Sequence, residues 1–195
     1  MIKTEARRVF LGVALAPAAL NVDCTLKRSR PDQNGKEELF REAIALYEDE
    51  EGGFATHALA EEPTARSALE RMFREAIDVY SRPGKPRGCM VASAATNCAT
   101  GNDAVMRWLA ERRRTRTKSI IDRLRRAVKQ GEFDPGADVV ALGDYFAALL
   151  HGLSVQARDG VPRKRLFALI ATALQALPQS RSAPRRHSRG SRRVE

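Results

Sequence analysis

Apolar side chains recur at intervals of three and four residues along most of this chain, and the segments that carry them are separated by glycine and proline. This spacing is typical of helices that bury one face. The alternation at every second residue that would indicate β-strands does not occur, and neither do paired hairpin turns. The pattern therefore predicts an all-α fold, a bundle of about six helices between residues 35 and 178.

Glycine and proline also predict where these helices begin and end. Proline is tolerated in the first turn of a helix and glycine readily ends one, so Pro63 and Pro162 mark expected starts and Gly131 an expected end. Residues 48–53 and 82–88 are expected to form loops. The predicted helices have these approximate bounds: 39–47, 63–80, 88–100, 102–131, 139–159 and 162–177.

The formal net charge of +10 is concentrated at the two ends of the chain. Residues 1–34 carry six Lys or Arg against three acids, and residues 179–195 carry six Arg against one Glu, whereas residues 35–178 hold 22 basic and 20 acidic side chains. The basicity that would suggest a nucleic-acid partner therefore belongs to the ends and not to the central region. Residues 179–195 have no apolar anchors and are expected to be a disordered basic tail.

The cysteines predict a reducing, cytoplasmic location. There are three of them, and the absence of a CxxC pair argues against a disulfide scaffold or a zinc module, so no metal site is expected. The apolar run at 9–15 resembles an export signal, but it is short and Pro17 follows it, so we do not expect export. No apolar run approaches the length of a membrane span, and no membrane partner is expected.

The common catalytic signatures are missing from the sequence. It contains no GxSxG, no HExxH, no phosphate-binding GxxxxGK and no GxGxxG. Among the histidines, His57 is expected in a loop and His187 in the tail, while His151 lies in an apolar helix where a satisfied core or interface histidine is commoner than a proton-transfer residue. Cys89 follows Gly88 in apolar company, which favours packing over a reactive thiol. The sequence therefore predicts no catalytic residues, no cofactor and no enzyme activity.

A run of cations interrupts the apolar pattern in the middle of the longest predicted helix. Its members are Arg112, Arg113, Arg114, Arg116 and Lys118. Charge runs on exposed helices are common, so we interpret this run as a solvated helix face. The alternative interpretation is a phosphate or anion site.

Four strings, in this order and spacing, resemble the regulatory body of the tetracycline-repressor (TetR/AcrR) family of transcription factors. They are Gly35-Lys36-Glu37-Glu38-Leu39-Phe40, Gly88-Cys89-Met90, the stretch 126–132 and the stretch 152–160. The resemblance covers about residues 34 to 178, and its last string is the most specific. It implies a ligand-responsive, all-helical homodimer that regulates transcription, with a small-molecule pocket enclosed by the middle helices.

The resemblance, together with the aromatic and polar residues of the middle helices, predicts the pocket wall. An adaptable apolar lining with a few polar groups suits a small apolar or amphipathic ligand of unknown identity. The predicted ligand-binding residues are Phe73, Tyr80, Met90, Asn97, Trp108 and Arg112. Ordinary packing is the alternative for each of them.

The last two predicted helices have broad apolar faces, which the resemblance implies are paired between two subunits. Such faces exceed what a small monomer normally exposes, and a two-fold contact closes on itself. The predicted dimer residues are Phe146, Leu149, Leu150, Leu153, Phe167, Ile170 and Leu174. Packing within one subunit is the alternative.

The first 34 residues depart from the family pattern, which places a three-helix DNA-binding head before the junction. They show no second helix, and Pro31 prevents a continuous helix into the junction. We expect 1–34 to be a degenerate head, lost by truncation or a shifted reading frame, with Lys36 as the one remaining phosphate contact. The alternatives are a repressor that binds DNA through 1–30 and the basic tail, or an enzyme acting on the pocket ligand.

Overall fold

The computed structural model describes residues 33–94 and 103–178. Within these ranges the chain forms seven α-helices and a short 3₁₀ helix, with no strand, which confirms the all-α prediction. The elements are α2 (Gln33–Glu50), α3 (Phe54–Glu61), α4 (Ala65–Tyr80), α5 (Met90–Ser93), α6 (Asp103–Lys129), α7 (Val139–Arg158), α8 (Arg163–Ala173) and η1 (Leu174–Ala176). The predicted tail at 179–195 and all but the last two residues of the predicted 1–34 segment lie outside the described residues.

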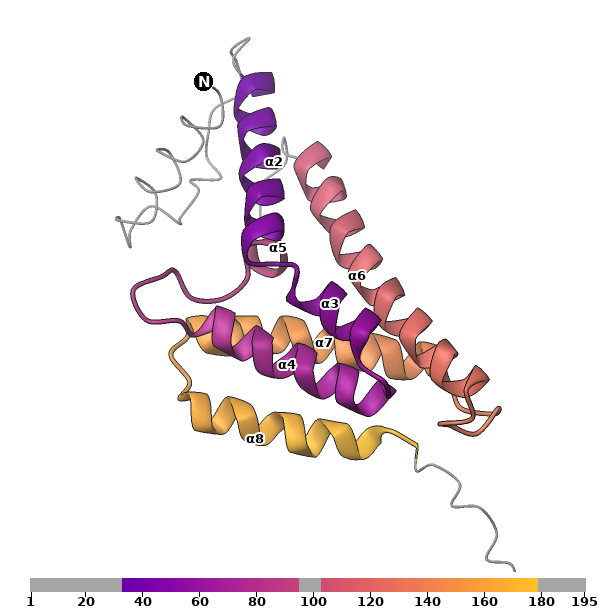
Figure 1. Ribbon diagram of the computed structural model, residues 1–195. Helices are drawn as coiled ribbons and strands as arrows, with labels where there is room; N and C mark the ends of the chain where they lie inside the picture. Colours follow the sequence, from indigo (N-terminus) through magenta and orange to yellow (C-terminus); the bar gives the residue numbers. More distant parts are fainter. Residues whose placement is uncertain (1–32, 95–102, 179–195) are drawn as a thin grey trace, which may run out of the picture.

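The helices form a packed base from which two arms rise. Helices α3, α4, α7 and α8 lie together in the base, while α2 and the N-terminal half of α6 extend away from it (Figure 1). Among the side chains of α2 that the structure describes, two are buried, Ile44 and Tyr47, and both lie in its C-terminal half. The first arm is therefore attached to the body mainly through the last turns of α2.

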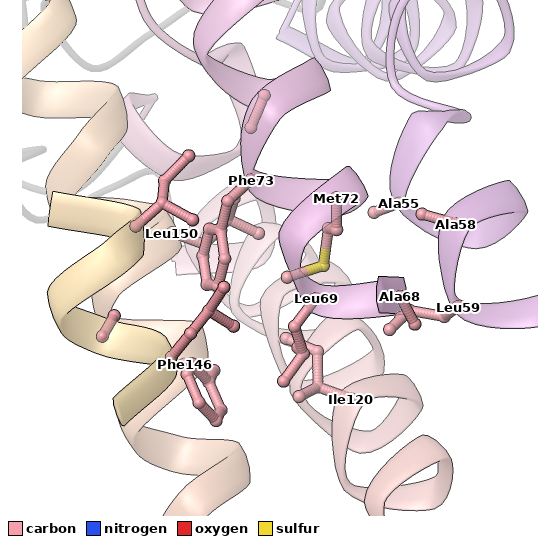
Figure 2. Packing of buried hydrophobic residues seen from close by; sticks show 14 of the residues in the cluster. Ala55, Ala58, Leu59, Ala68, Leu69, Met72, Phe73, Ile120, Phe146 and Leu150 are labelled. Carbon is pink, nitrogen blue, oxygen red and sulfur yellow. The ribbon is translucent and has the colours of Figure 1, made fainter. Parts of the chain in front are cut away.

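The core of the base is built on α4, which buries one complete face. Leu69, Met72 and Phe73 of α4 are fully buried among residues of α3, α6 and α7 (Figure 2). The ring centroids of Phe73 and Phe146 lie 5.9 Å apart, a separation typical of favourable aromatic pairs. Burial of each large apolar side chain contributes about 1.5–3 kcal/mol, so this face contributes several kcal/mol to the stability of the bundle.

The C-terminal end of α6 is fixed by a buried ion pair. Arg123 Nη2 lies 3.4 Å from Glu132 Oε1, and the Arg123 side chain is only 1% exposed. The other carboxylate oxygen of Glu132 accepts a hydrogen bond of 2.6 Å from the Ala65 amide, at the first residue of α4. This one carboxylate therefore both neutralises a buried guanidinium and caps the start of the central core helix.

Helices α6 and α7 cross at a glycine. A Cβ added to Gly143 would lie 2.2 Å from Ile121 Cγ1, far inside van der Waals contact. The absence of a side chain at this position lets the two backbones approach closely.

The structure corrects several of the predicted element bounds. Helix α3 was predicted as a loop, which placed His57 wrongly, because eight residues are too few to display a clear helical period. The predicted helix at 88–100 is confined, in the residues described there, to the four residues of α5, and none of these is fully buried. Gly131, with φ at +76°, follows α6 as predicted, because glycine adopts this left-handed conformation without strain.

Helix α7 is the one described helix that is long and apolar enough to cross a membrane by length and composition. The expectation that no segment reaches that length therefore does not hold for α7. The core helix of a helical bundle meets the same criterion, and α7 packs on α4, α6 and α8.

Candidate ligand cavity

A small cavity of about 40 Å³ lies where the C-terminal end of α2 meets α5, α6 and α7. A space of this size holds about one water molecule or a group of similar volume. The lining residues are Tyr47, Glu48, Gly52, Phe54, Tyr80, Cys89, Val91, Ala92, Arg112, Arg113, Arg116, Leu150 and His151. The cavity thus combines aromatic and aliphatic walls with a cluster of cations.

Two tyrosines and a cysteine form one wall. Burial is the main reason that the pKa values of Tyr47 and Tyr80 are raised above that of free tyrosine, and the neighbouring Cys89 contributes to both shifts. Both phenols are therefore neutral near pH 7. The Tyr47 hydroxyl faces Cys89 and the Met90 backbone but makes no hydrogen bond of ordinary geometry, which leaves a buried donor beside the cavity.

The segment before α5 is tied to α7 by its backbone. Gly88 has φ at +87°, and its amide donates to the Tyr80 carbonyl at 2.9 Å. The next amide, that of Cys89, donates to the hydroxyl of buried Ser154 at 2.7 Å. A Cβ at Gly88 would lie 3.0 Å from the Ser154 carbonyl oxygen, so glycine suits both the conformation and the close approach. Two of the strings that carry the family resemblance, 88–90 and 152–160, thus meet in space.

Three arginines of α6 face the cavity and contact other parts of the chain. Arg113 donates to the Val91 carbonyl at 2.9 Å, and Arg116 donates to the Gly52 carbonyl at 3.3 Å. Arg112 forms an ion pair with Glu48, and its Nε is buried without a hydrogen-bond partner. The predicted solvated face is therefore wrong for these three side chains, whose neighbours come from elements distant in the sequence.

The other two cations of the run are exposed, as predicted for a solvated face. Arg114 pairs with Glu111 at 2.7 Å, and Lys118 pairs with Asp122 at 2.8 Å. Both pairs lie within α6 at helical spacing. The run thus has two sides, one toward the solvent and one toward the cavity.

His151 of α7 completes the polar side of the cavity. Burial, and secondarily the nearby positive charge of Arg113, lower the pKa of His151 below its ordinary value of 6.5. The imidazole is therefore neutral at pH 7. It adds a hydrogen-bonding group without adding a further charge.

The predicted ligand-binding residues are only partly brought together. Tyr80 and Arg112 line the cavity. Phe73 is packed against Phe146 in the core and does not reach the cavity, because α4 presents it to α7. Met90 belongs to α5 but is not among the lining residues, and Asn97 lies outside the described residues.

Trp108, also predicted for the pocket wall, packs instead between two guanidinium groups. Its ring centroid lies 5.3 Å from the Arg112 guanidinium carbon and 5.4 Å from that of Arg41. This stack bridges α2 and α6 just beyond the cavity.

Sequence reasoning missed most of the α2 and α6 contributions to the wall. Tyr47 ended a predicted helix and Glu48 began a predicted loop, while Arg113 and Arg116 stood in a run interpreted as solvated. The signal that was available is the spacing of Leu109, Arg113, Arg116 and Ile120, which repeats at four, three and four residues and therefore shares one helix face.

Five of the seven predicted dimer residues are buried within one subunit: Phe146, Leu150, Leu153, Ile170 and Leu174. They pack in the core because their face of α7 and α8 is turned toward α4. Leu149 and Phe167 are only partly buried. The side chain of Lys36, the predicted phosphate contact, lies outside the described residues. In the described part of the chain, no group of three or more His, Cys, Asp or Glu side chains is placed to hold a metal ion.

Comparison with known proteins agrees with this architecture. A family model described as "Tetracyclin repressor-like, C-terminal domain" matches residues 65–163. The HTH-type transcriptional repressor ComR of Escherichia coli (strain K12) is 24% identical over 145 residues, which are 74% of this chain and 69% of ComR.

Two similar solved structures are cysteine mutants of the TetR family transcriptional regulator CifR bound to operator DNA. One is 35% identical, with a TM-score of 0.72, and the match covers 76% of this chain and 81% of that one. The other is 36% identical, with a TM-score of 0.71, and the match covers 73% of this chain and 74% of that one. From the matching domain, the shared helical fold and this identity, we conclude that the chain belongs to the tetracycline-repressor family of transcriptional regulators.

Proposed function

We propose that residues 35–178 are the ligand-responsive, dimerising body of a cytoplasmic TetR-family regulator, and that the cavity is its effector site. The observation that supports this most directly is the position of the cavity under α2. Ile44, Tyr47 and Glu48 attach α2 to the body, and two of these three line the cavity. A ligand that binds more tightly to one position of α2 than to another shifts the arm that leads to the N-terminal segment.

A cavity-filling variant tests the effector site. Ala92→Phe places a ring in the cavity and should abolish the rise in Tm that a small-molecule panel produces in the parent protein. Ala60→Phe, at an exposed position of α3, is the matched control and should retain the response. Equal responses from the two variants would place the ligand elsewhere.

We further propose that the outer face of α7 forms the homodimer contact. Exposed or half-exposed residues repeat along this face at intervals of four and three: Ala141, Tyr145, Ala148, Gly152 and Val155. Tyr145 is 44% exposed and Val155 is 50% exposed, which is unusual for large apolar side chains on a core helix. Small residues between them allow a second helix to approach closely, and the partly exposed Leu149 follows Ala148 on the same helix.

Sedimentation of an Ala148→Arg variant tests this contact. The parent should sediment as a dimer at micromolar concentration, and the variant as a monomer with unchanged helical content, because a charge in the middle of an apolar contact is not compensated. Ala60→Arg should remain dimeric. A monomeric parent protein would exclude the contact.

For DNA, we propose that the body by itself has no operator specificity. Residues 35–178 are nearly neutral, and the basic charge of the chain lies at its ends. Any binding should therefore be non-specific and should fall steeply with salt.

The second candidate, a repressor that contacts DNA through its basic ends, is favoured by the six arginines at 179–195. A gel shift with DNA from upstream of the gene, using the chain with and without residues 179–195, separates these two candidates. A repressor that binds through its basic ends should form a complex that resists salt and is lost when the tail is deleted.

A further inference from the structure

We propose that the effector of this cavity is a small organic anion, a carboxylate with an apolar body, whose acidic group is held by Arg113 and Arg116. This inference rests on the proposed function, because it assigns a chemical class to the effector site. The argument depends on the charges, the unused donors and the walls of the cavity.

The cavity contains more positive than negative charge. Three guanidinium groups line it, and Glu48 is the one carboxylate among its lining residues, already paired with Arg112. Arg113 and Arg116 have no carboxylate within ion-pair distance among the described residues. Their recorded hydrogen bonds go to backbone carbonyls, which orient the two groups without neutralising them.

Arg123, near the C-terminal end of α6, has a structural role and serves as a comparison for Arg113. Arg123 is buried and lies beside the Glu132 carboxylate, whereas Arg113 is half-buried and lies beside none in the described part of the chain. Desolvation lowers the pKa of both arginines, but Glu132 partly offsets this at Arg123, whereas at Arg113 the neighbouring Arg114 adds to the lowering. An anion from outside supplies the missing partner.

Hydrogen-bond donors beside the cavity are also unused. The Nε of Arg112 and the hydroxyl of Tyr47 are both buried without a hydrogen bond of ordinary geometry. Each is a donor, and an ionised carboxylate offers only acceptors. The two tyrosines remain protonated because their pKa values are raised, so they do not repel an anion.

The size and the walls favour a carboxylate attached to an apolar or aromatic body. About 40 Å³ accommodates the acidic group itself. Phe54, Tyr80 and Leu150 provide rings and methyl groups around it, and Phe54 and Tyr80 meet edge to face with centroids 6.1 Å apart. The rest of the ligand must displace contacts of α2, which connects occupancy to the arm.

Trp108 is the single tryptophan of the chain and reports on this site, because its ring stacks on Arg112. The full chain is titrated with benzoate and cinnamate and, as neutral isosteres, with benzamide and cinnamamide, following Trp108 emission and Tm. The acids should bind about tenfold or more tightly than the amides, since charge-assisted hydrogen bonds are lost in the neutral compounds.

Substituting one arginine on the cavity side of α6 and one on its exposed side shows which of them binds the acids. Arg113→Gln should weaken binding of the acids by about tenfold, and Arg113→Lys by less, because the charge is kept but not the forked geometry. The control is Arg114→Gln, one residue away on the exposed side of α6, which should bind within about twofold of the parent. Far-UV circular dichroism and Tm without ligand establish that each variant is folded.

Either of two results of the titrations would overturn the anionic class. One is binding of the amides as tight as that of the acids, and the other is equal affinity of the acids for the Arg113→Gln and Arg114→Gln variants. If Ala92→Phe then still blocks binding, the effector site stands and only the anionic class is lost. Absence of binding by every acid in the panel would also overturn it, and the effector site is then judged by the neutral compounds alone.

Discussion

Arg123 in the C-terminal half of α6 and the pair Arg113 and Arg116 in its N-terminal half occupy contrasting environments. In the C-terminal half, Arg123 is 3% exposed and paired with Glu132, next to the fully buried Ile120 and Leu124. In the N-terminal half, Arg113 and Arg116 are half-buried beside a cavity and have no carboxylate partner among the described residues. The buried charge of Arg123 is compensated within the fold, and the two arginines without a described carboxylate partner are the ones that we propose hold the effector.

The largest expected effect comes from disrupting the C-terminal half. Glu132→Gln keeps an acceptor for the Ala65 amide but leaves Arg123 as an uncompensated buried charge. Removing one partner of such a pair costs about 3–5 kcal/mol, so the free energy of unfolding in urea should fall by about 3 kcal/mol. A change below about 0.5 kcal/mol would show that the pair is not a structural anchor.

The next effect concerns the crossing of α6 and α7. Gly143→Ala should lower the free energy of unfolding by about 1–3 kcal/mol, because the new methyl group collides with Ile121. Gly152→Ala, in the same helix with no atom within 4 Å of the added Cβ, should raise it by about 1 kcal/mol through helix propensity. Equal changes in denaturant midpoint at the two glycines would mean that the helices do not approach as described.

Removing an unpaired cation from the N-terminal half should have much less effect on stability. Arg113→Gln relieves the desolvated charge but loses the bond to Val91, so the two contributions nearly cancel. The free energy of unfolding without ligand should change by less than about 1 kcal/mol. If Arg113→Gln lowered the free energy of unfolding as much as Glu132→Gln, Arg113 would be as important for stability as the Arg123–Glu132 pair.

The smallest effect is a dependence on pH. The pKa of His151 is lowered in the folded protein, so the unfolded chain binds a proton more readily and stability declines as pH falls through about 6.5. The charged and titratable groups that share its cavity are Arg112, Arg113, Arg116, Glu48, Cys89, Tyr47 and Tyr80. Urea titrations from about pH 7.5 to about pH 5 should show a shallower decline for His151→Gln. Parallel curves would assign the decline to other groups.

The sequence was sufficient to predict the all-α class and the long helices α4, α6 and α7. It was insufficient for the short elements and for the direction of individual side chains. Helix α3 covers little more than two turns, so its period is not distinguishable from a loop. Phe146 and Leu150 were apolar enough for an interface, and only the packing of α7 on α4 shows that they are internal. Arg113 and Arg114 are neighbours in the sequence, and only the rotation of α6 separates their environments.

The docking of the Cys89 amide on Ser154 has a consequence for cooperativity. The inner side of α7 receives this contact next to the cavity, and its outer side carries the proposed homodimer contact. In such a dimer the single helix α7 would contact both the effector and the neighbouring subunit. Filling one site would then alter the affinity of the other, and a ligand titration with a Hill coefficient different from one would be its signature.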